Sequence, residues 1–257
     1  MRRIVTLLLA LPLAACSSGT PAATPATSAA GPKAGTRCAE LASPGRPVAF
    51  QTPAGTQLAG VEFGTGPTGI VLAHQNASNL CEWLPFGKRL ADRGYRVLAF
   101  DFAGDGDSGA RHPDDRLDDD VAAAAAYLRT TGAAKVVLIG ASKGGAAVLA
   151  AAPAVNPAPA AVVTLSAPKL FSGVSAADAV PRLPAPALFL AAENDHPFAE
   201  AAKEFDATAP AAVPHQVFLA LGAEHGTGLL GGGQAKKVAE LIETFVGQHT
   251  GQSAPPQ

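Results

Sequence analysis

Runs of apolar, often β-branched residues alternate with longer stretches of helical periodicity along most of the chain. Six runs are predicted to be strands: residues 69–73, 96–100, 135–139, 161–165, 187–191 and 216–219. Five stretches are predicted to be helices: residues 83–92, 117–130, 142–151, 198–207 and 234–246. Nearly continuous apolar strands separated by helices are typical of a parallel sheet covered on both faces, so the pattern predicts an α/β fold.

Two further runs lie before this alternating part of the chain. Residues 50–52 and 57–63 are separated by a short segment that contains Pro53 and Gly55, and are predicted to form an antiparallel hairpin. Gly94 and Gly132 follow two of the predicted helices and are expected to terminate them.

The N-terminus has the pattern of an export signal. Arg2 and Arg3 precede an apolar stretch over residues 4–15, which is too short to span a bilayer and ends in small residues. Residues 13–16, Leu-Ala-Ala-Cys, resemble the lipobox of bacterial lipoproteins, which is cut before a cysteine that carries the lipid. We therefore predict a signal peptide over 1–15, lipidation of Cys16 and an extracytoplasmic, lipid-anchored location on the bacterial cell membrane; ordinary secretion with loss of Cys16 is the alternative.

Composition then sets the domain organisation. Residues 16–36 contain almost no bulky apolar side chain and cannot bury enough surface to fold, so they are predicted to be a flexible tether. The rest of the 257-residue chain, which is 48% hydrophobic overall, is long enough for one large core. We assign one domain to residues 37–247 and a disordered tail to the polar residues 248–257.

The net charge bears on the binding partners of the chain, and the cysteines bear on its covalent cross-links. The formal net charge of −2 comes from mixed signs without long basic runs, so the sequence predicts no nucleic-acid partner. Cys38 and Cys81 are an even pair in an exported chain and are predicted to form a disulfide, which the chain-entropy model values at roughly 4 kcal/mol. Two unpaired buried thiols are the alternative.

Residues 140–144, Gly-Ala-Ser-Lys-Gly, carry the most specific chemical signal. They match the Gly-x-Ser-x-Gly nucleophile elbow and lie where that motif requires, between a predicted strand and a predicted helix. The sharp turn lifts the Ser142 hydroxyl above the sheet, and the helix that follows lets the Lys143 backbone N–H donate to a developing oxyanion. An ordinary glycine-rich turn is the alternative.

At this motif the chain resembles the α/β-hydrolase superfamily, in particular serine hydrolases of the dienelactone hydrolase and carboxylesterase type, and the resemblance covers about residues 50–246. It implies a mostly parallel central sheet and the triad order serine, acid, histidine along the chain. Asp195 is expected to be the acid, with Glu193 as its rival and a solvated loop acid as the bland alternative. His225 is expected to be the histidine, in a glycine-rich loop after the last strand.

The resemblance also suggests where a second oxyanion donor lies. The loop after the strand at 69–73 begins His74-Gln75-Asn76, which is similar to the family's His-Gly-x segment with Gln75 in place of the glycine. The Asn76 amide is the first candidate and the Gln75 amide the second. His74 itself is interpreted as a structural loop histidine.

Two other motifs are set aside. Residues 104–109 fit G-x-G-x-x-G, but two aspartates would repel a pyrophosphate and His112-Pro113 interrupts the helix that should follow. The same loop lacks a glutamate at the twelfth position of a calcium loop, where Arg116 lies. The five carboxylates in residues 114–120 are expected to complement a helix dipole and cap its amides rather than bind a metal. We predict neither a metal nor a cofactor.

Only about twenty residues separate the strands at 161–165 and 187–191, where larger members of the family carry a helical cap, so no large cap domain is expected. A capless site suits small or flexible acyl substrates, so we predict hydrolysis of small acyl esters through a Ser-His-Asp triad and an acyl-enzyme rather than a lid-gated lipase. Dienelactone hydrolysis, peptidase or thioesterase activity would use the same triad. We also predict a monomer. The competing hypothesis is a non-enzymatic envelope lipoprotein that uses the hydrolase scaffold to bind a ligand or partner.

Overall fold

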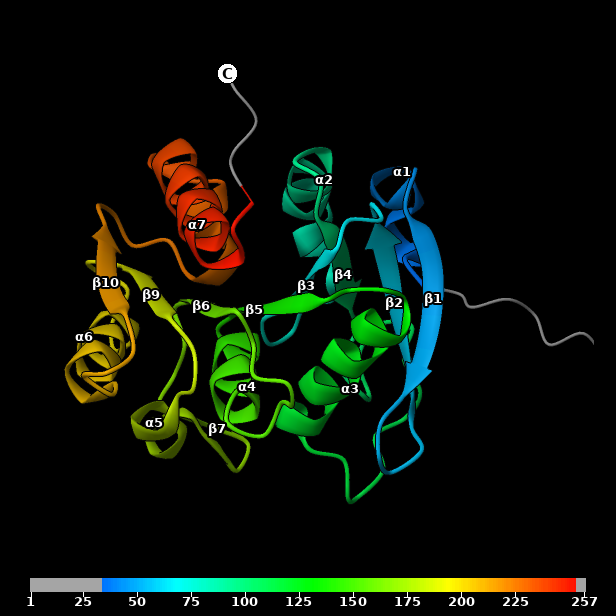
Figure 1. Cartoon of the computed structure of the whole chain (residues 1–257), viewed down its shortest axis with the longest axis horizontal. Coiled ribbons are helices and arrows are strands. Elements are labelled where there is room, and N and C mark those ends of the chain that lie inside the picture. The colour runs from blue at the N-terminus through cyan, green and yellow to red at the C-terminus, as the bar shows by residue number, and fades with distance from the viewer. Residues whose placement is uncertain (1–33, 253–257) are drawn as a thin grey trace, which may run out of the picture. The chain divides into compact units, whose positions relative to one another are not determined.

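The computed structural model describes residues 34–252, so Cys16, the predicted signal peptide, most of the predicted tether and residues 253–257 lie outside the described residues. Its centre is an eight-stranded sheet in the order β1-β2-β4-β3-β5-β6-β9-β10 (Figure 1). The strands are β1 (Arg46–Gln51), β2 (Gln57–Phe63), β3 (Thr68–Ala73), β4 (Arg96–Phe100), β5 (Lys135–Ala141), β6 (Ala161–Leu165), β9 (Ala187–Ala192) and β10 (His215–Ala220). All six strands of the alternating pattern are present, and the strands from β4 to β10 in this order pair in parallel.

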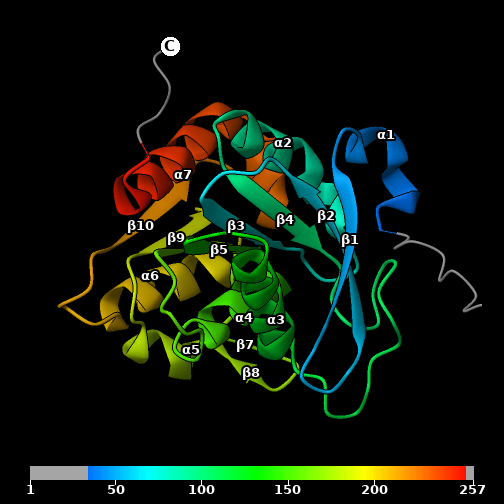
Figure 2. The same cartoon turned by 45° about the vertical axis from the view of Figure 1, so that its right-hand side comes forward.

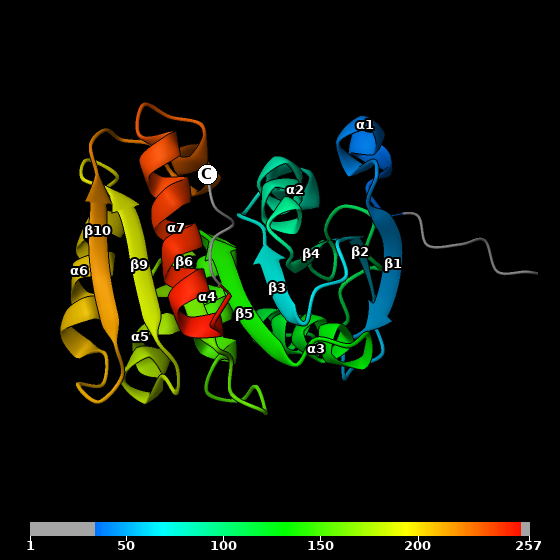
Figure 3. The same cartoon turned by 45° about the horizontal axis from the view of Figure 1, so that its top comes forward.

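Helices cover both faces of the sheet, as the apolar strands require (Figures 1 and 3). The helices α3 (Leu117–Thr130), α4 (Lys143–Ala151) and α6 (Phe198–Thr208) contribute to one apolar cluster, whereas α2 (Leu84–Asp92) and α7 (Ala235–Thr250) contribute to the other. Successive residues of β5 point to opposite faces, so Val136 and Leu138 join the first cluster while Val137 and Ile139 join the second. The predicted α/β fold, a mostly parallel sheet with helices on both faces, is thereby confirmed.

The first two strands form the predicted antiparallel hairpin. β1 begins at Arg46, earlier than the sequence pattern indicated, and Phe50 lies opposite Leu58. β2 then pairs in the antiparallel sense with β4, which joins the hairpin to the parallel strands. The predicted disulfide between Cys38 and Cys81 is present and links η1 (Thr36–Cys38) to η2 (Leu80–Trp83).

The folded part extends beyond the predicted domain at both ends. Ala34 is buried, and Thr36 donates hydrogen bonds from its N–H and its hydroxyl to the Asp107 carboxylate, so the last residues assigned to the tether pack on the domain. At the other end α7 continues to Thr250, whose carbonyl accepts a hydrogen bond of 2.8 Å from Lys135 Nζ. Both boundaries were misplaced because these tertiary partners lie far away in sequence.

A small insertion occupies the position of a cap. It consists of the two-stranded β7 (Leu170–Phe171) and β8 (Val174–Ser175) hairpin, the single turn α5 (Ala176–Ala179) and η3 (Val180–Arg182) (Figure 2). These elements are too short for a periodic sequence signal, and none was predicted. Over residues 34–252, no helix has the length and apolarity needed to cross a bilayer.

Candidate active site

The turn between β5 and α4 is strained at Ser142, which has φ 46° and ψ −115° and precedes the first residue of α4. Backbone approaches closely on both sides of it. A Cβ at Gly140 would lie 2.2 Å from the Gly144 carbonyl oxygen, and a Cβ at Gly144 would lie 2.1 Å from the Ala73 carbonyl oxygen. The two motif glycines therefore allow this turn to sit against β3, in the geometry that the elbow motif predicts.

Asp195 and His225 lie together at the ends of neighbouring strands β9 and β10. His225 Nδ1 is 2.9 Å from Asp195 Oδ2, and the imidazole packs 4.3 Å from the centre of the Phe198 ring. The Asp195 side chain is only 9% exposed, whereas Glu193 is exposed. A buried carboxylate on Nδ1 holds a histidine with Nε2 free to exchange a proton, so the geometry favours Asp195 over Glu193.

The end of β6 brings the elbow and the histidine loop together. Ser142 N–H donates to the Leu165 carbonyl at 2.8 Å, and Gly226 N–H donates to the Ser166 hydroxyl at 3.0 Å. Among residues 34–252, no hydrogen bond joins the Ser142 hydroxyl to the His225 imidazole. Contacts of this kind often tighten only around a substrate.

The loop after β3 carries the two residues predicted to supply the second oxyanion donor. The Gln75 backbone N–H donates to Glu82 Oε1 at 2.8 Å, so it is already occupied and the prediction of Gln75 as a donor is wrong. Asn76 lines a cavity of about 480 Å³ together with Lys143, the residue that follows the nucleophile. The candidate backbone donors are therefore Asn76 and Lys143.

Gln75 instead braces the site. Thr227 N–H donates to its side-chain oxygen at 3.3 Å, and a Cβ at Gly226 would lie 2.1 Å from that oxygen. Burial raises the pKa of Glu82, which accepts the Gln75 backbone N–H. Gln75 thus connects the oxyanion loop to the loop that follows His225, and the large sequence separation left no pattern from which to predict this contact.

The Lys143 side chain makes a second connection that the sequence did not reveal. Its Nζ lies 2.6 Å from Asp105 Oδ2 and 4.7 Å from the centre of the Phe102 ring, and the side chain is only 5% exposed. Burial lowers the pKa of Lys143, and the Asp105 carboxylate opposes that shift. The ion pair ties the elbow to the loop after β4.

His74 has a structural role in this geometry. It is fully buried, its Nδ1 lies 2.8 Å from the Gln75 carbonyl oxygen, and its Nε2 accepts the Phe102 N–H at 3.2 Å. Burial lowers the pKa of His74 to about 4, so the ring is neutral near pH 7 and carries a proton on Nδ1. The 3.8 Å approach of its Nε2 to Asp105 is therefore not an ion pair.

The loop at 104–109 is a structural turn. Ser108 accepts the Ala59 N–H at 2.8 Å and donates to the Asp101 carbonyl at 2.6 Å, which fixes the loop against β2. A Cβ at Gly106 would lie 2.0 Å from the Asp101 carboxylate, leaving no room for a phosphate there. Within residues 34–252, no group of three or more His, Cys, Asp or Glu side chains is placed to hold a metal ion.

The acidic run before α3 requires a correction. Asp118, Asp119 and Asp120 lie in the first turn and complement the helix dipole, but no side chain caps the helix at Arg116. Asp120 instead accepts the Ala103 N–H at 3.0 Å. The predicted capping role is wrong because Asp120 has a tertiary partner and Asp118 pairs with the Arg116 side chain, 3.2 Å away.

The chain matches the α/β hydrolase fold family over residues 69–245, which includes the elbow and both members of the Asp195–His225 pair. It belongs to the α/β-hydrolase fold family. Among curated proteins, none is significantly similar to it in sequence.

Solved structures of esterases share this family member's fold. The Pyrococcus furiosus esterase Pf2001 is 15% identical with a TM-score of 0.67, covering 82% of this chain and 92% of its own. RhEst1 from Rhodococcus is 19% identical with a TM-score of 0.63, covering 78% of this chain and 98% of its own. Est1E from Butyrivibrio proteoclasticus, solved with ferulic acid, is 16% identical with a TM-score of 0.64, covering 79% and 99%. At these identities the similarity establishes the fold.

Proposed function

We propose that this chain is an extracytoplasmic serine hydrolase that cleaves esters of small acyl groups. The observation that carries the proposal is the buried Asp195 carboxylate on His225 Nδ1, in a loop packed beside the strained Ser142 elbow. This combination supplies a nucleophile, a base and a group that orients the base. Esterase neighbours with the same fold agree with it.

The reaction follows from these positions. His225 Nε2 takes the Ser142 hydroxyl proton as the oxygen attacks the ester carbonyl, and Asp195 stabilises the imidazolium. The oxyanion accepts hydrogen bonds from the Lys143 and Asn76 backbone N–H groups. His225 then gives its proton to the departing alkoxide, and water, activated in the same way, converts the acyl-enzyme to the free acid and Ser142.

The test is hydrolysis of 4-nitrophenyl butyrate by the purified full-length chain. Ser142→Ala and Asp195→Asn are expected to lower kcat by at least about 10³-fold, because each removes a member of a unit that acts together. Glu193→Gln is the matched control, since this exposed carboxylate leaves the rate unchanged. Equal losses from Asp195→Asn and Glu193→Gln would contradict the assignment of the acid.

The location is part of the proposal. Lipidation of Cys16 would place the domain outside the cytoplasm, attached to the membrane through the lipid on that residue. Radiolabelled fatty acid fed to the expressing bacterium is expected to label the wild-type chain and not a Cys16→Ser variant; equal labelling of both would contradict the anchor.

A silent hydrolase scaffold that binds a ligand is the second candidate. The observation that favours it is that, over residues 34–252, the Ser142 hydroxyl has no hydrogen bond to His225. A binder would retain its ligand in Ser142→Ala and would show no turnover in the wild type.

A further inference from the structure

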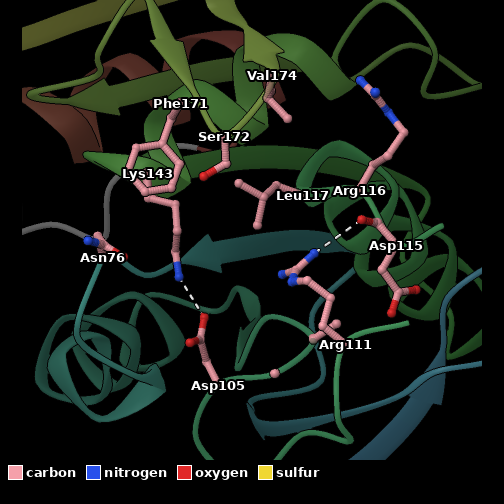
Figure 4. Close-up of a pocket in the computed structure, with 12 residues that line it drawn as sticks. Asn76, Asp105, Arg111, Asp115, Arg116, Leu117, Lys143, Phe171, Ser172 and Val174 are labelled. Atoms are coloured by element: carbon pink, nitrogen blue, oxygen red, sulfur yellow. Dashed lines mark hydrogen bonds and ion pairs between the residues drawn. The ribbon is translucent and has the colours of Figure 1, made fainter. Parts of the chain in front are cut away.

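The 480 Å³ cavity beside the elbow has two chemically different ends (Figure 4). Asn76 and Lys143, whose backbone N–H groups are the candidate oxyanion donors, lie at one end together with Asp105. Arg111 and Arg116 lie at the other. A substrate whose carbonyl oxygen lies between the two donors therefore extends toward a pair of arginines.

The cavity suits the acyl half of an ester. The departing alcohol must lie within reach of His225, which returns its proton. In the part of the chain that the structure describes, the residues around this cavity include neither Ser142 and His225 nor the η4 turn (Gly226–Leu230), and the cavity adjoins the elbow through Lys143. We therefore assign the acyl chain to the cavity and the alcohol to the side of His225.

Two of the cations that line the cavity have close counter-ions. Lys143 Nζ is 2.6 Å from Asp105, and Arg116 Nε is 3.2 Å from Asp118. Neither cation is therefore well placed to bind an additional anion. The third cation is Arg111.

Arg111 lies beside Asp115, whose carboxylate is turned away from it. Both carboxylate oxygens of Asp115 are occupied by the Thr52 and Thr56 hydroxyls and the His112 N–H, at 2.6 to 2.9 Å. The only hydrogen bond that Arg111 donates to Asp115, within the described residues, goes to its backbone carbonyl, at 3.3 Å (Figure 4). The hydrogen bonds to the Asp115 carboxylate thus come from the β1–β2 turn and from His112, whereas the guanidinium acts on its charge without a hydrogen bond to it.

The remaining carboxylate near Arg111 is Asp120, at 3.7 Å. It is fully buried and its Oδ2 already accepts the Ala103 N–H. Burial raises the pKa of Asp120 to about 7, so near neutrality a large part of the population carries no charge. A guanidinium has five N–H donors, and these two contacts leave most of them free.

We propose that Arg111 is a specificity-determining residue that binds a carboxylate at the far end of the acyl chain. This inference rests on the proposed ester hydrolysis and names its substrate class, half-esters of short dicarboxylic acids. Leu117, Phe171 and Val174 line the same cavity and suit the methylene groups of such an acid (Figure 4). A planar guanidinium can hold the carboxylate through two parallel hydrogen bonds.

The test compares monomethyl glutarate with methyl valerate, two methyl esters with equal numbers of acyl carbons. The wild type is expected to favour monomethyl glutarate, and Arg111→Gln to lower kcat/KM for that ester at least about tenfold, mainly through KM. The rate of Arg111→Gln with methyl valerate is expected to stay within about twofold of the wild-type rate. Arg111→Lys is expected to restore part of the loss with monomethyl glutarate. Arg182→Gln is the matched control, because Arg182, like Arg111, reaches a backbone carbonyl four residues away but lies outside the cavity.

Calorimetry with Ser142→Ala separates this inference from the proposed function. Monomethyl glutarate is expected to bind Ser142→Ala and to bind at least about tenfold more weakly when Arg111→Gln is added. Hydrolysis of methyl valerate without any preference for the charged ester would overturn the inference and leave the function standing. Arg111-dependent binding without turnover would overturn the function and support the anion site, and absence of both would overturn both.

Discussion

Gly144 shows how a single residue holds the candidate site together. It follows Lys143 in α4, and its Cα faces the carbonyl groups at the end of β3. A methyl group there would meet the Ala73 oxygen at 2.1 Å and the His74 oxygen at 2.8 Å. All of these atoms belong to the backbone of residues 73 and 74, so no flexible side chain could move aside to make room for the methyl group.

Gly144→Ala is therefore expected to lower the free energy of unfolding by about 2 kcal/mol or more, and to reduce ester turnover by displacing the oxyanion loop. Urea unfolding and the 4-nitrophenyl butyrate assay measure the two effects. Gly233→Ala is the control, since a methyl group there meets nothing within 4 Å. Similar effects of the two changes would contradict the close packing inferred at the elbow.

At the scale of an element, α3 carries a buried carboxyl that gives a pH signature. Burial raises the pKa of Asp120 from 3.8 to about 7, with Ala103 N–H and Arg111 opposing the shift and Asp115 and Asp119 adding to it. At pH values between these two pKa values, Asp120 binds more protons in the folded chain than in the unfolded chain. The contribution of Asp120 to the free energy of unfolding thus falls as the pH rises from about 4 to about 7.

Asp120→Asn removes this titration while keeping an oxygen for the Ala103 N–H. When the pH is raised from 5 to 8, the difference in the free energy of unfolding between the variant and the wild type is expected to grow by on the order of 2 kcal/mol in favour of the variant. Urea unfolding at both pH values gives the difference. Asp114→Asn alters an exposed carboxylate of the same acidic run and serves as the control; a gain as large in this variant would contradict the burial argument.

The long elements were predictable because their signals are local. Apolar runs set β3 to β6, β9 and β10, and the bounds of α3 agree with the sequence pattern. The short β7–β8 hairpin and α5 lack such periodicity and form through contacts with α4. The cap of α3 was mispredicted because Asp120 accepts a hydrogen bond from Ala103, a partner distant in sequence, and Asp118 pairs with Arg116.

At the site, the sequence predicted residues that a motif or strand order marks. Ser142 lies in a defined turn, and Asp195 and His225 follow successive strands, so all three could be named in advance. Gln75 was misassigned because its N–H partner, Glu82, belongs to no motif. Arg111 was missed because it also belongs to no motif. Its proposed role depends on the ion pairs and hydrogen bonds that the neighbouring charged side chains make in the folded structure.

At the scale of the whole folded part, the disulfide joins η1, in the N-terminal segment, to η2, which follows β3. Cys38 and Cys81 are 43 residues apart, and the bridge restricts the unfolded chain over that loop. Replacing both by serine is expected to lower the free energy of unfolding by roughly 4 kcal/mol and Tm by about 10 °C.

Differential scanning calorimetry of this double variant measures the effect. The reduced wild type is expected to melt with the variant, and the oxidised wild type above both. Equal Tm for the variant and the oxidised wild type would contradict a stabilising role of the bridge.

Ser142 is proposed to be a nucleophile that His225 and Asp195 activate. A fluorophosphonate probe tests this without knowledge of the substrate, because it reacts with activated serines. We expect an adduct located at Ser142 by peptide mass spectrometry, lost in Ser142→Ala and strongly reduced in His225→Ala. Absence of labelling in a wild-type chain shown by circular dichroism to be folded would contradict catalysis by Ser142.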